Sequence, residues 1–196
     1  MKKRGFWKDA LILFAITLVA AAALSCVYSL TKEPIKTAEE ETKKAAYEKV
    51  FAGVSFESFQ GADALLSDVN DALHSGEIKY DGISLEKATV SEILLATDKN
   101  GNAVGFVLSV SSKGGYGGEI QAAVGVKTGG ELTGLTVVSH SETAGIGAKY
   151  ADKEYTSADK VDVVSGATYT TTALKEIYGA ALYAADTAES GVSADA

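Results

Sequence analysis

Four β-rich runs follow one another in the middle of the chain: "ATVSEILLATD" (88–98), "AVGFVLSVSS" (103–112), "GEIQAAVGVKT" (118–128) and "ELTGLTVVSH" (131–140). The connections between them are short and rich in turn-forming residues, with KNGN after the first run, KGGYG after the second and GG after the third. β-branched runs joined in this way are typical of hairpins. Three hairpin-like connections in succession predict an antiparallel sheet.

Helical patterns flank these runs on both sides. Residues 52–85 are irregular except for "GADALLSDVNDALHSG" (61–76), which predicts a helix. After the sheet, "SETAGIGAKYADKEY" (141–155) is partly helical, and "VDVVSGATYTTTALKEI" (161–177) predicts a strand, a turn and a helix. This order of elements predicts an α+β fold rather than a wound parallel sheet. The final "TAESGVSADA" (187–196) predicts a disordered tail.

The N-terminal part of the chain has the pattern of a membrane anchor. Residues 10–30 contain no charge and would span roughly 30 Å as a helix, which matches the hydrocarbon core of a bilayer. The basic residues of the segment 1–9 precede the span, and by the positive-inside rule this end stays in the cytoplasm. We therefore expect a single-pass protein of the cell membrane whose remaining residues are extracytoplasmic.

Two other export signals fit the same segment less well. A cleaved signal peptide would use "AAALS", but the apolar run continues beyond that site. A lipid anchor at Cys26 would need a large aliphatic residue three positions earlier, where Ala23 stands. In each case the domain is exported. Residues 31–52 predict a solvated helical stalk with Pro34 in its first turn, and residues 53–186 then form the folded domain.

Composition excludes several classes of function. Beyond residue 30 the chain keeps 14 basic and 25 acidic residues, a net charge of about −11, so a nucleic-acid partner is excluded. One cysteine permits no intrachain disulfide and no cysteine-based metal or iron–sulfur site, and two histidines permit no histidine-rich metal site. Any redox chemistry must therefore come from an organic cofactor.

Two glycine-rich stretches are candidate ligand loops. In "KGGYGGEI" (113–120), Tyr116 could stack on a planar ligand, although a plain hairpin loop explains the same pattern. In "SHSETAGIGAKY" (139–150), His140 and Glu142 are the titratable groups at the end of a strand. Thr143 could cap a helix and Gly145 lets the backbone turn, so a structural strand-to-helix connection is the alternative.

A third stretch combines a tight turn with several hydroxyl groups. In "VDVVSGATYTTT", Gly166 and Ala167 keep the turn small, so backbone N–H groups at the start of the following helix can face an anion. Hydroxyl groups surround this turn at Ser165, Thr168, Thr170, Thr171 and Thr172. The residues alone do not distinguish a phosphate site from a helix with more caps than it needs.

This stretch resembles the flavinylation signature of FMN-binding domains, Asp-x-x-Ser/Thr-Gly-Ala-Thr/Ser. Every defined position is filled, by Asp162, Ser165, Gly166, Ala167 and Thr168. Family members also carry a GYGG stretch, here residues 115–118, and an HxETPGxG loop, here HSETAGIG with Ala144 in place of proline. Over its whole length the chain is similar to the G subunit of Rnf electron-transport complexes, and less so to the longer C subunit of the sodium-pumping quinone reductase.

The resemblance implies that a dedicated flavin transferase esterifies Thr168 to the phosphate of FMN. The other cofactor-binding residues implied by the motifs are Asp162, Ser165, Gly166, Ala167, Thr171, Tyr116, Gly117, His140, Glu142, Thr143 and Gly145. No metal site is implied.

The resemblance also implies a function. The chain would be a membrane-anchored electron carrier with one covalent FMN, working with other membrane subunits of an Rnf-type complex. Such complexes couple electron transfer between ferredoxin and NAD⁺ to the translocation of sodium ions or protons. The chain would not be catalytic alone. The alternatives are an FMN-binding flavoprotein of another extracytoplasmic electron-transfer chain, and a non-catalytic exported module.

Overall fold

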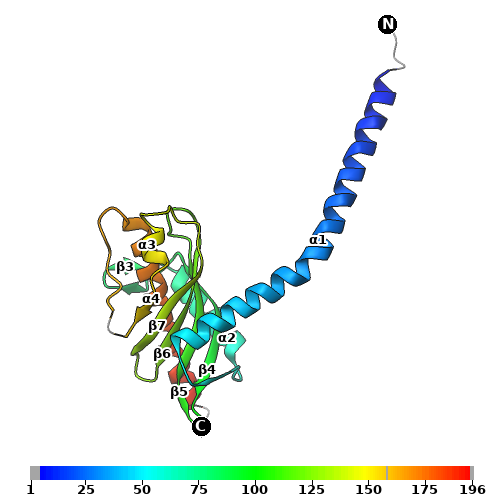
Figure 1. Cartoon of the computed structure of the whole chain (residues 1–196). Helices are drawn as coiled ribbons and strands as arrows, with labels where there is room; N and C mark the ends of the chain where they lie inside the picture. Colours follow the sequence, from blue (N-terminus) through cyan, green and yellow to red (C-terminus); the bar gives the residue numbers. More distant parts are fainter. Residues whose placement is uncertain (1–4, 158, 195–196) are drawn as a thin grey trace. The chain divides into compact units, whose positions relative to one another are not determined.

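The computed structural model describes residues 5–157 and 159–194 (Figure 1). The chain divides into two compact units, Met1–Thr42 and Lys43–Ala196. The helix α1, Phe6–Val50, begins in the first unit and ends in the second.

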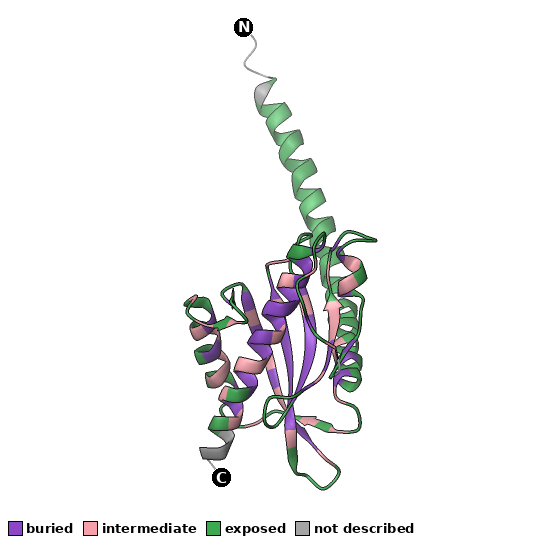
Figure 2. Ribbon diagram, turned by 90° about the vertical axis from the view of Figure 1, so that its left-hand side faces the viewer, coloured by how far each residue is buried: buried purple, intermediate pink, exposed green. Residues whose placement is uncertain are grey.

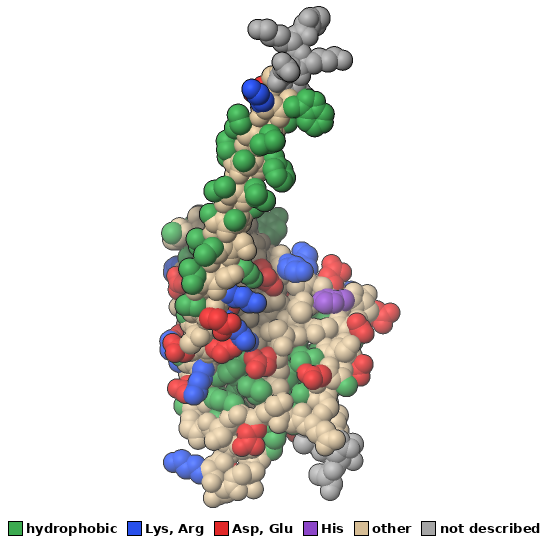
Figure 3. Space-filling view, turned by 90° about the vertical axis from the view of Figure 1, so that its right-hand side faces the viewer, with side chains coloured by type: hydrophobic (Ala, Val, Ile, Leu, Met, Phe, Trp, Pro, Cys, Tyr) green, Lys and Arg blue, Asp and Glu red, His purple; other side chains and the backbone are tan. Residues whose placement is uncertain are grey.

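The first unit is the N-terminal part of α1. Its described side chains are exposed, and hydrophobic side chains follow one another along its apolar stretch (Figures 2 and 3). It is the one helix in the described part of the chain that is long and apolar enough to cross a membrane. Hydroxyl groups along it donate to carbonyls of the preceding turn, as Ser29 does to Ser25 O at 3.0 Å and Thr31 to Val27 O at 2.9 Å, which satisfies them without water.

The position of Pro34 differs from the one predicted from the sequence. It lies inside α1 rather than in the first turn of a separate helix. The apolar segment and the charged segment after it are both made of helix-forming residues, so one helix runs through both, and one proline removes a single backbone donor from a long ladder.

The second unit contains a six-stranded antiparallel sheet, which confirms the predicted α+β fold. The strand order is β1-β4-β5-β6-β7-β8. The four predicted runs form the centre of the sheet as β4 (Ala88–Thr97), β5 (Ala103–Ser112), β6 (Ile120–Lys127) and β7 (Leu132–Ser139). Two short strands complete the edges, β1 (Ser55–Glu57) beside β4 and β8 (Tyr155–Thr156) beside β7.

Two helices cover one face of this sheet. These are α2 (Ala62–His74), as predicted, and α4 (Thr168–Ala194), whose alanine-rich face packs on the strands (Figure 2). Ala188 is 1% exposed, so the segment expected to be a disordered tail begins as a packed part of α4. Over residues 187–194 the structure differs from that expectation, because alanines at helical spacing continue the buried stripe past residue 186, while residues 195 and 196 lie outside the described residues.

The last two turns of α1 cover the opposite face. Ala46, Tyr47 and Val50 pack against Val107 and Ala123 of the central strands. The backbone of Val50 lies directly on Gly125, where an added Cβ would come within 2.8 Å of the Val50 carbonyl oxygen and 2.2 Å of Thr133 Oγ1. The compact unit thus starts inside the expected stalk, and the end of that segment is part of the fold rather than a spacer.

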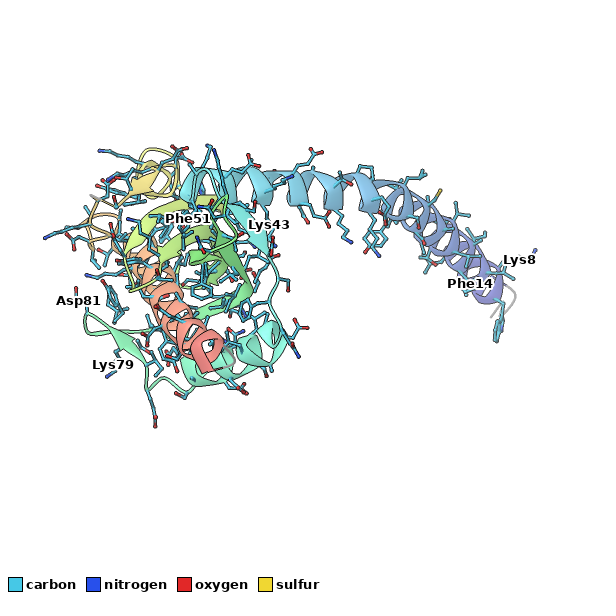
Figure 4. The ribbon with its side chains drawn as sticks, turned by 90° about the horizontal axis from the view of Figure 1, so that it is seen from below. Lys8, Phe14, Lys43, Phe51, Lys79 and Asp81 are labelled. Atoms are coloured by element: carbon cyan, nitrogen blue, oxygen red, sulfur yellow. The ribbon has the colours of Figure 1, made fainter. Side chains whose placement is uncertain are left out.

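Polar contacts secure this end of α1. Glu92 of β4 accepts hydrogen bonds from the Tyr47 hydroxyl at 2.6 Å and from Lys43 Nζ at 2.9 Å. Burial works to raise the pKa of Glu92, but these two hydrogen bonds and the Lys43 charge outweigh it and hold the pKa below its usual value. Thr133 donates to Val50 O at 2.5 Å. Figure 4 labels Lys43 and, just beyond the helix, Phe51.

The stretch before α4 also differs from expectation. Residues 161–164 were expected to form a strand, but they have no regular secondary structure. The backbone N–H of Val164 donates to the Thr171 hydroxyl at 3.0 Å instead of to a neighbouring strand. A short helix, α3 (Ala148–Ala151), follows β7, in agreement with the partly helical pattern there.

Candidate functional site

A tight turn at residues 164–168 leads into α4. The N–H of Ala167 donates to Val164 O at 3.1 Å, and Gly166 between them has φ +89°, a left-handed conformation that favours glycine. The Thr171 hydroxyl closes the turn, because it accepts from Val164 N–H at 3.0 Å and donates to Ala167 O at 2.9 Å. The turn is therefore held by the helix that follows it.

The threonines at this turn have different roles. Thr171 is 2% exposed and fastens the turn, so its hydroxyl proton is directed at the backbone rather than at a ligand. Thr170 is 1% exposed and donates to the Glu142 carboxylate. Thr168 is exposed, and its hydroxyl makes one long hydrogen bond, 3.4 Å to Val164 O. Thr168 thus presents a hydroxyl group to solvent from a rigid support.

Glu142 joins three segments of the site. Its carboxylate is buried, accepts a hydrogen bond from the Gly117 N–H at 2.9 Å, and accepts another from the Thr170 hydroxyl. Gly147 packs over this pair, since an added Cβ would lie 2.5 Å from both Glu142 Oε2 and Thr170 Oγ1. The two loops of the sequence motifs and the start of α4 are thereby fixed to one another.

His140 positions the loop that carries Glu142. Its Nδ1 accepts a hydrogen bond from the Glu142 backbone N–H at 3.0 Å, so the ring proton is on Nε2, which lies 3.0 Å from Asp152 Oδ1. The His140 ring contacts the backbone of Glu142 and not its carboxylate. The His140 ring therefore positions the backbone of this loop.

A hollow of about 210 Å³ opens beside Thr168. Residues 166–170 form one side of it, and Tyr116, Glu142, Thr143, Ile146 and Gly147 form the rest. A second hollow shares the 166–167 turn and is lined also by Gly145, Ile146, Lys149, Tyr150 and Ser165. The turn at residues 166–167 therefore lies between two depressions of the surface.

Aromatic and apolar side chains are exposed around the first hollow. Tyr116 and Tyr169 are 70% and 66% exposed, and their rings are 6.2 Å apart and tilted by 47°. Within residues 43–194, apart from position 158 and the side chains not described, the exposed large hydrophobic residues are these two, Ile146 and Val163. Three of the four line this hollow. Exposed apolar groups that gather in one place mark a binding site.

Sequence reasoning missed Tyr169 and Glu176. Tyr169 follows Thr168 directly, and an aromatic residue in the exposed first turn of a helix was the available signal. Glu176 is 4% exposed and accepts a hydrogen bond from Ser112, whose oxygen in turn accepts from the Gly114 N–H at 3.0 Å. Burial raises the pKa of Glu176, although the Ser112 hydrogen bond opposes that shift. No local pattern in the sequence marked this second support of the glycine-rich loop.

The predicted residues fall into two groups. Tyr116, Glu142, Thr143 and residues 166–168 line the first hollow together, while Gly145 and Ser165 line its neighbour. Asp162, His140 and Thr171 line neither hollow. His140 and Thr171 bond to the lining residues Glu142 and Ala167, whereas Asp162 lies 3.8 Å from Lys175. Gly117 contributes its N–H to Glu142. Among the described residues no cluster of histidine, cysteine and carboxylate groups could hold a metal ion.

Comparison with known families agrees with this geometry. Residues 115–183, which include the glycine-rich loop, Glu142 and Thr168, match the model of the FMN-binding domain. The site therefore belongs to the class of FMN-binding domains.

A second match and the relatives narrow the class. Residues 1–50 match the model of the RnfG N-terminal region. The chain is 30% identical over 144 residues to the G subunit of the Na(+)-translocating ferredoxin:NAD(+) oxidoreductase complex of Acetobacterium woodii, covering 73% of this chain and 64% of the relative. It is 29% identical over 184 residues to the G subunit of the ion-translocating oxidoreductase complex of Methanosarcina acetivorans, covering 85% and 87%. The corresponding G subunit of Aliivibrio fischeri is 28% identical over 142 residues, covering 72% and 61%.

The chain belongs to the RnfG family of ion-translocating oxidoreductase subunits, which carry an FMN-binding domain. The alignments span less than two thirds of the Acetobacterium and Aliivibrio relatives.

Proposed function

We propose that this chain is an electron carrier that holds FMN as a phosphoester of Thr168. One observation carries the proposal. The hydroxyl groups of Thr170 and Thr171 are buried and hydrogen-bonded within the protein. The Thr168 hydroxyl is exposed, makes one long hydrogen bond, and lies on the turn that the other two threonines hold in place. The neighbouring threonines are needed because they hold the acceptor in place.

The residues around Thr168 fit a phosphate-linked flavin. The left-handed turn at Gly166 precedes the N-terminus of α4, where backbone N–H groups favour a phosphate. The exposed rings of Tyr116 and Tyr169 offer aromatic faces to a planar ring system next to it. When bound, FMN supplies the one- and two-electron redox chemistry that no side chain of this domain provides.

Attachment is a transfer of a phosphoryl group and involves no oxidation. The Thr168 oxygen forms a bond to the FMN phosphorus while the phosphoanhydride bond of a flavin dinucleotide donor breaks. The hydroxyl proton passes to a base of the flavin transferase, and a nucleoside monophosphate leaves. This chain contributes the acceptor hydroxyl and the rigid turn that presents it.

The same residues orient the attached group and leave part of it accessible. Pockets that enclose a ligand of this size measure about 300–1,000 Å³, and the hollow of about 210 Å³ is smaller. Glu142 fixes Gly117, and with it the loop of Tyr116, relative to Thr170 next to Tyr169. The two tyrosines would hold one side of a bound flavin, and a hollow of this size would leave the rest of the flavin accessible to an electron-transfer partner.

The proposed setting is the extracytoplasmic side of the cell membrane. The apolar part of α1 serves as the anchor, and the basic residues before it keep the N-terminus in the cytoplasm. The partners are the other membrane subunits of an Rnf-type complex, as the relatives' names suggest, and a flavin transferase acts during maturation. The chain passes electrons between neighbours and is not catalytic alone.

Intact mass of the full chain purified from its native membranes under denaturing conditions tests the attachment. We expect a gain of one FMN less one water, and fluorescence on the peptide that contains Thr168. A chain without added mass, from a host with an active flavin transferase, would refute the carrier function. Copurification with other membrane subunits separates an Rnf-type complex from a different extracytoplasmic electron-transfer chain.

A further inference from the structure

Lys175 lies about two helical turns after Thr168 on α4 and is nearly buried, with 8% of its surface exposed. Its ammonium group pairs with the carboxylate of Asp81 and lies 3.8 Å from Asp162 Oδ1. Asp162 belongs to the attachment signature, whereas Asp81 comes from a part of the chain that the signature does not include. Lys175 therefore connects the attachment segment to a remote element.

That element is a β-hairpin that packs against α4. Its strands are β2 (Lys79–Tyr80) and β3 (Ile83–Ser84), and Asp81 occupies the turn with φ 47° (Figure 4). The rings of Tyr80 and Tyr178 meet edge to face with centroids 5.3 Å apart. Tyr80 also packs against Gly179, where an added Cβ would lie 2.5 Å from its Cβ. The hairpin that carries Asp81 is thus fixed to α4 by the packing of Tyr80.

The ammonium group of Lys175 stays charged in this place. Hydrogen bonding to Asp81 raises the pKa of Lys175, against an opposing effect of burial, and the charges of Asp81 and Asp162 add to the rise. Most of the Lys175 side chain is covered, whereas the two carboxylates that its ammonium group meets are exposed, so these ion pairs lie at the surface. Asp81 and Asp162 are the carboxylate partners of this ammonium group.

The segment before the attachment turn depends on this contact. Among the described residues, the hydrogen bonds of the chain do not involve residues 160–163, and backbone bonding resumes at Val164. Val161 is buried, and the Asp162 carboxylate near Lys175 is the other side-chain tether of this segment. Loss of Lys175 therefore removes the ion pair that ties residues 160–163 to α4.

We propose that Lys175 is a positioning residue for flavin attachment, held by Asp81 and holding Asp162. Through Asp162 it keeps residues 160–163, which lead into the turn, in the conformation that a flavin transferase accepts. This inference rests on the proposed attachment at Thr168. The β2–β3 hairpin thereby becomes part of the maturation site, although it lies far from Thr168 in sequence.

A positioning role predicts a particular kinetic effect. If loss of Lys175 leaves the accepted conformation only fractionally populated, the apparent affinity of the transferase for the chain falls by that fraction. The turnover number is retained, because the chain that does bind is in the correct conformation. The KM for the acceptor chain should therefore rise, by about tenfold for a conformation populated at about 10%.

The test uses the full chain, produced without a flavin transferase and purified in detergent. Purified flavin transferase and a flavin dinucleotide donor are added, and initial rates of labelling are followed by fluorescence in denaturing gels at several chain concentrations. Lys175→Met is compared with Lys175→Arg, which keeps the charge, and with Lys99→Met, which changes an exposed lysine in the β4–β5 turn. Circular dichroism reports the folded fraction of each variant.

We expect a raised KM with an unchanged turnover number for Lys175→Met, and values near wild type for Lys175→Arg and Lys99→Met. Wild-type KM in folded Lys175→Met would overturn the proposal. If Lys175→Met does not fold, Asp162→Asn replaces it, because this variant keeps the Lys175–Asp81 pair. Asp162→Asn should then raise the KM, and labelling with wild-type kinetics would also overturn the proposal. Failure of the wild-type chain to be labelled would instead refute the proposed function.

Discussion

The two faces of the sheet are built in different ways. Under α2 and α4 lies a large apolar core, and hydroxyl and carboxylate groups gather where α4 begins. On the opposite face a small cluster receives the end of α1, with Gly125 giving close backbone contact and Glu92 giving a polar clamp. The first arrangement presents a hydroxyl group to solvent, and the second fixes a helix. A threonine that donates to a backbone carbonyl serves in both, as Thr171 and Thr133 do.

Replacing Thr168 should abolish the function proposed for the α4 face and leave its structure unchanged. We expect Thr168→Val to abolish covalent flavin. Stability should change by about 0.5 kcal/mol, because the lost hydrogen bond is long and solvent-exposed. In-gel fluorescence measures the first effect and thermal melting followed by circular dichroism the second. Thr172→Val, about one turn further along α4, is the matched control and should be labelled normally. Covalent flavin on Thr168→Val would show that another residue is the acceptor.

Adding a side chain at Gly125 should disrupt the packing of the end of α1 on the sheet. In Gly125→Ala the new Cβ would overlap Thr133 Oγ1 and the Val50 carbonyl, so the sheet and the helix end must separate. We expect a loss of about 3 kcal/mol in the free energy of unfolding, measured by urea denaturation of the full chain in detergent. Gly191→Ala is the control, since an added Cβ there meets open space within α4, and it should be neutral or slightly stabilising. Equal stability of the two variants would contradict the close contact.

Removing Glu142 should loosen the site without unfolding the sheet. Glu142→Ala leaves the buried Thr170 hydroxyl without its acceptor, which we expect to lower stability by about 2 kcal/mol. The Gly117 N–H also loses its acceptor, so backbone amides of residues 114–118 should exchange faster with deuterated solvent. Glu119→Ala, an exposed glutamate next to the same loop, should change neither quantity. Unchanged amide exchange in Glu142→Ala would mean that the loop is held by other contacts.

Glu92 and Glu176 should make the stability of the fold depend on pH in opposite directions. Hydrogen bonds and charge lower the pKa of Glu92 despite burial, so its contribution is present above its ordinary pKa of 4.5 and is lost as pH falls through the folded value. Burial raises the pKa of Glu176, so the folded state favours the protonated form, and stability is lost as pH rises from 4.5 through the folded value.

The melting temperatures of wild type, Glu92→Gln and Glu176→Gln between pH 3.5 and pH 7 test these directions, with small shifts expected. The deficit of Glu92→Gln relative to wild type should grow as pH rises. Any deficit of Glu176→Gln should shrink over the same range. A deficit of Glu176→Gln that grows with pH would show that the Ser112 hydrogen bond outweighs burial.

The sequence predicted those parts of the fold in which local signals agree. Short turns between β-rich runs defined the central strands, and the spacing of apolar residues defined α2. The signature and the two glycine-rich loops led to residues that the fold brings around one hollow. Each of these signals is contained within a few neighbouring residues.

Long-range contacts account for what was missed. Val161–Val164 have the composition of a strand, but the Thr171 hydroxyl takes the Val164 N–H and no partner strand from the described residues lies beside them. The hairpin at 79–84 is too short to give a period, and its place depends on Tyr178 and Gly179 about a hundred residues later. The packing of residues 46–50 depends on Gly125. From the sequence alone, a glycine inside a strand indicates only a position that weakens the strand.

The exposed position of Thr168 has a consequence for biosynthesis. The turn is closed by Thr171 and fixed by Thr170 and Glu142, so the acceptor is complete before any cofactor arrives. Under the proposed attachment, the chain folds first and is labelled second, and export of the polypeptide need not wait for flavin supply. An unlabelled chain is then already folded, so quality control that detects unfolded protein would not remove a chain that lacks its cofactor.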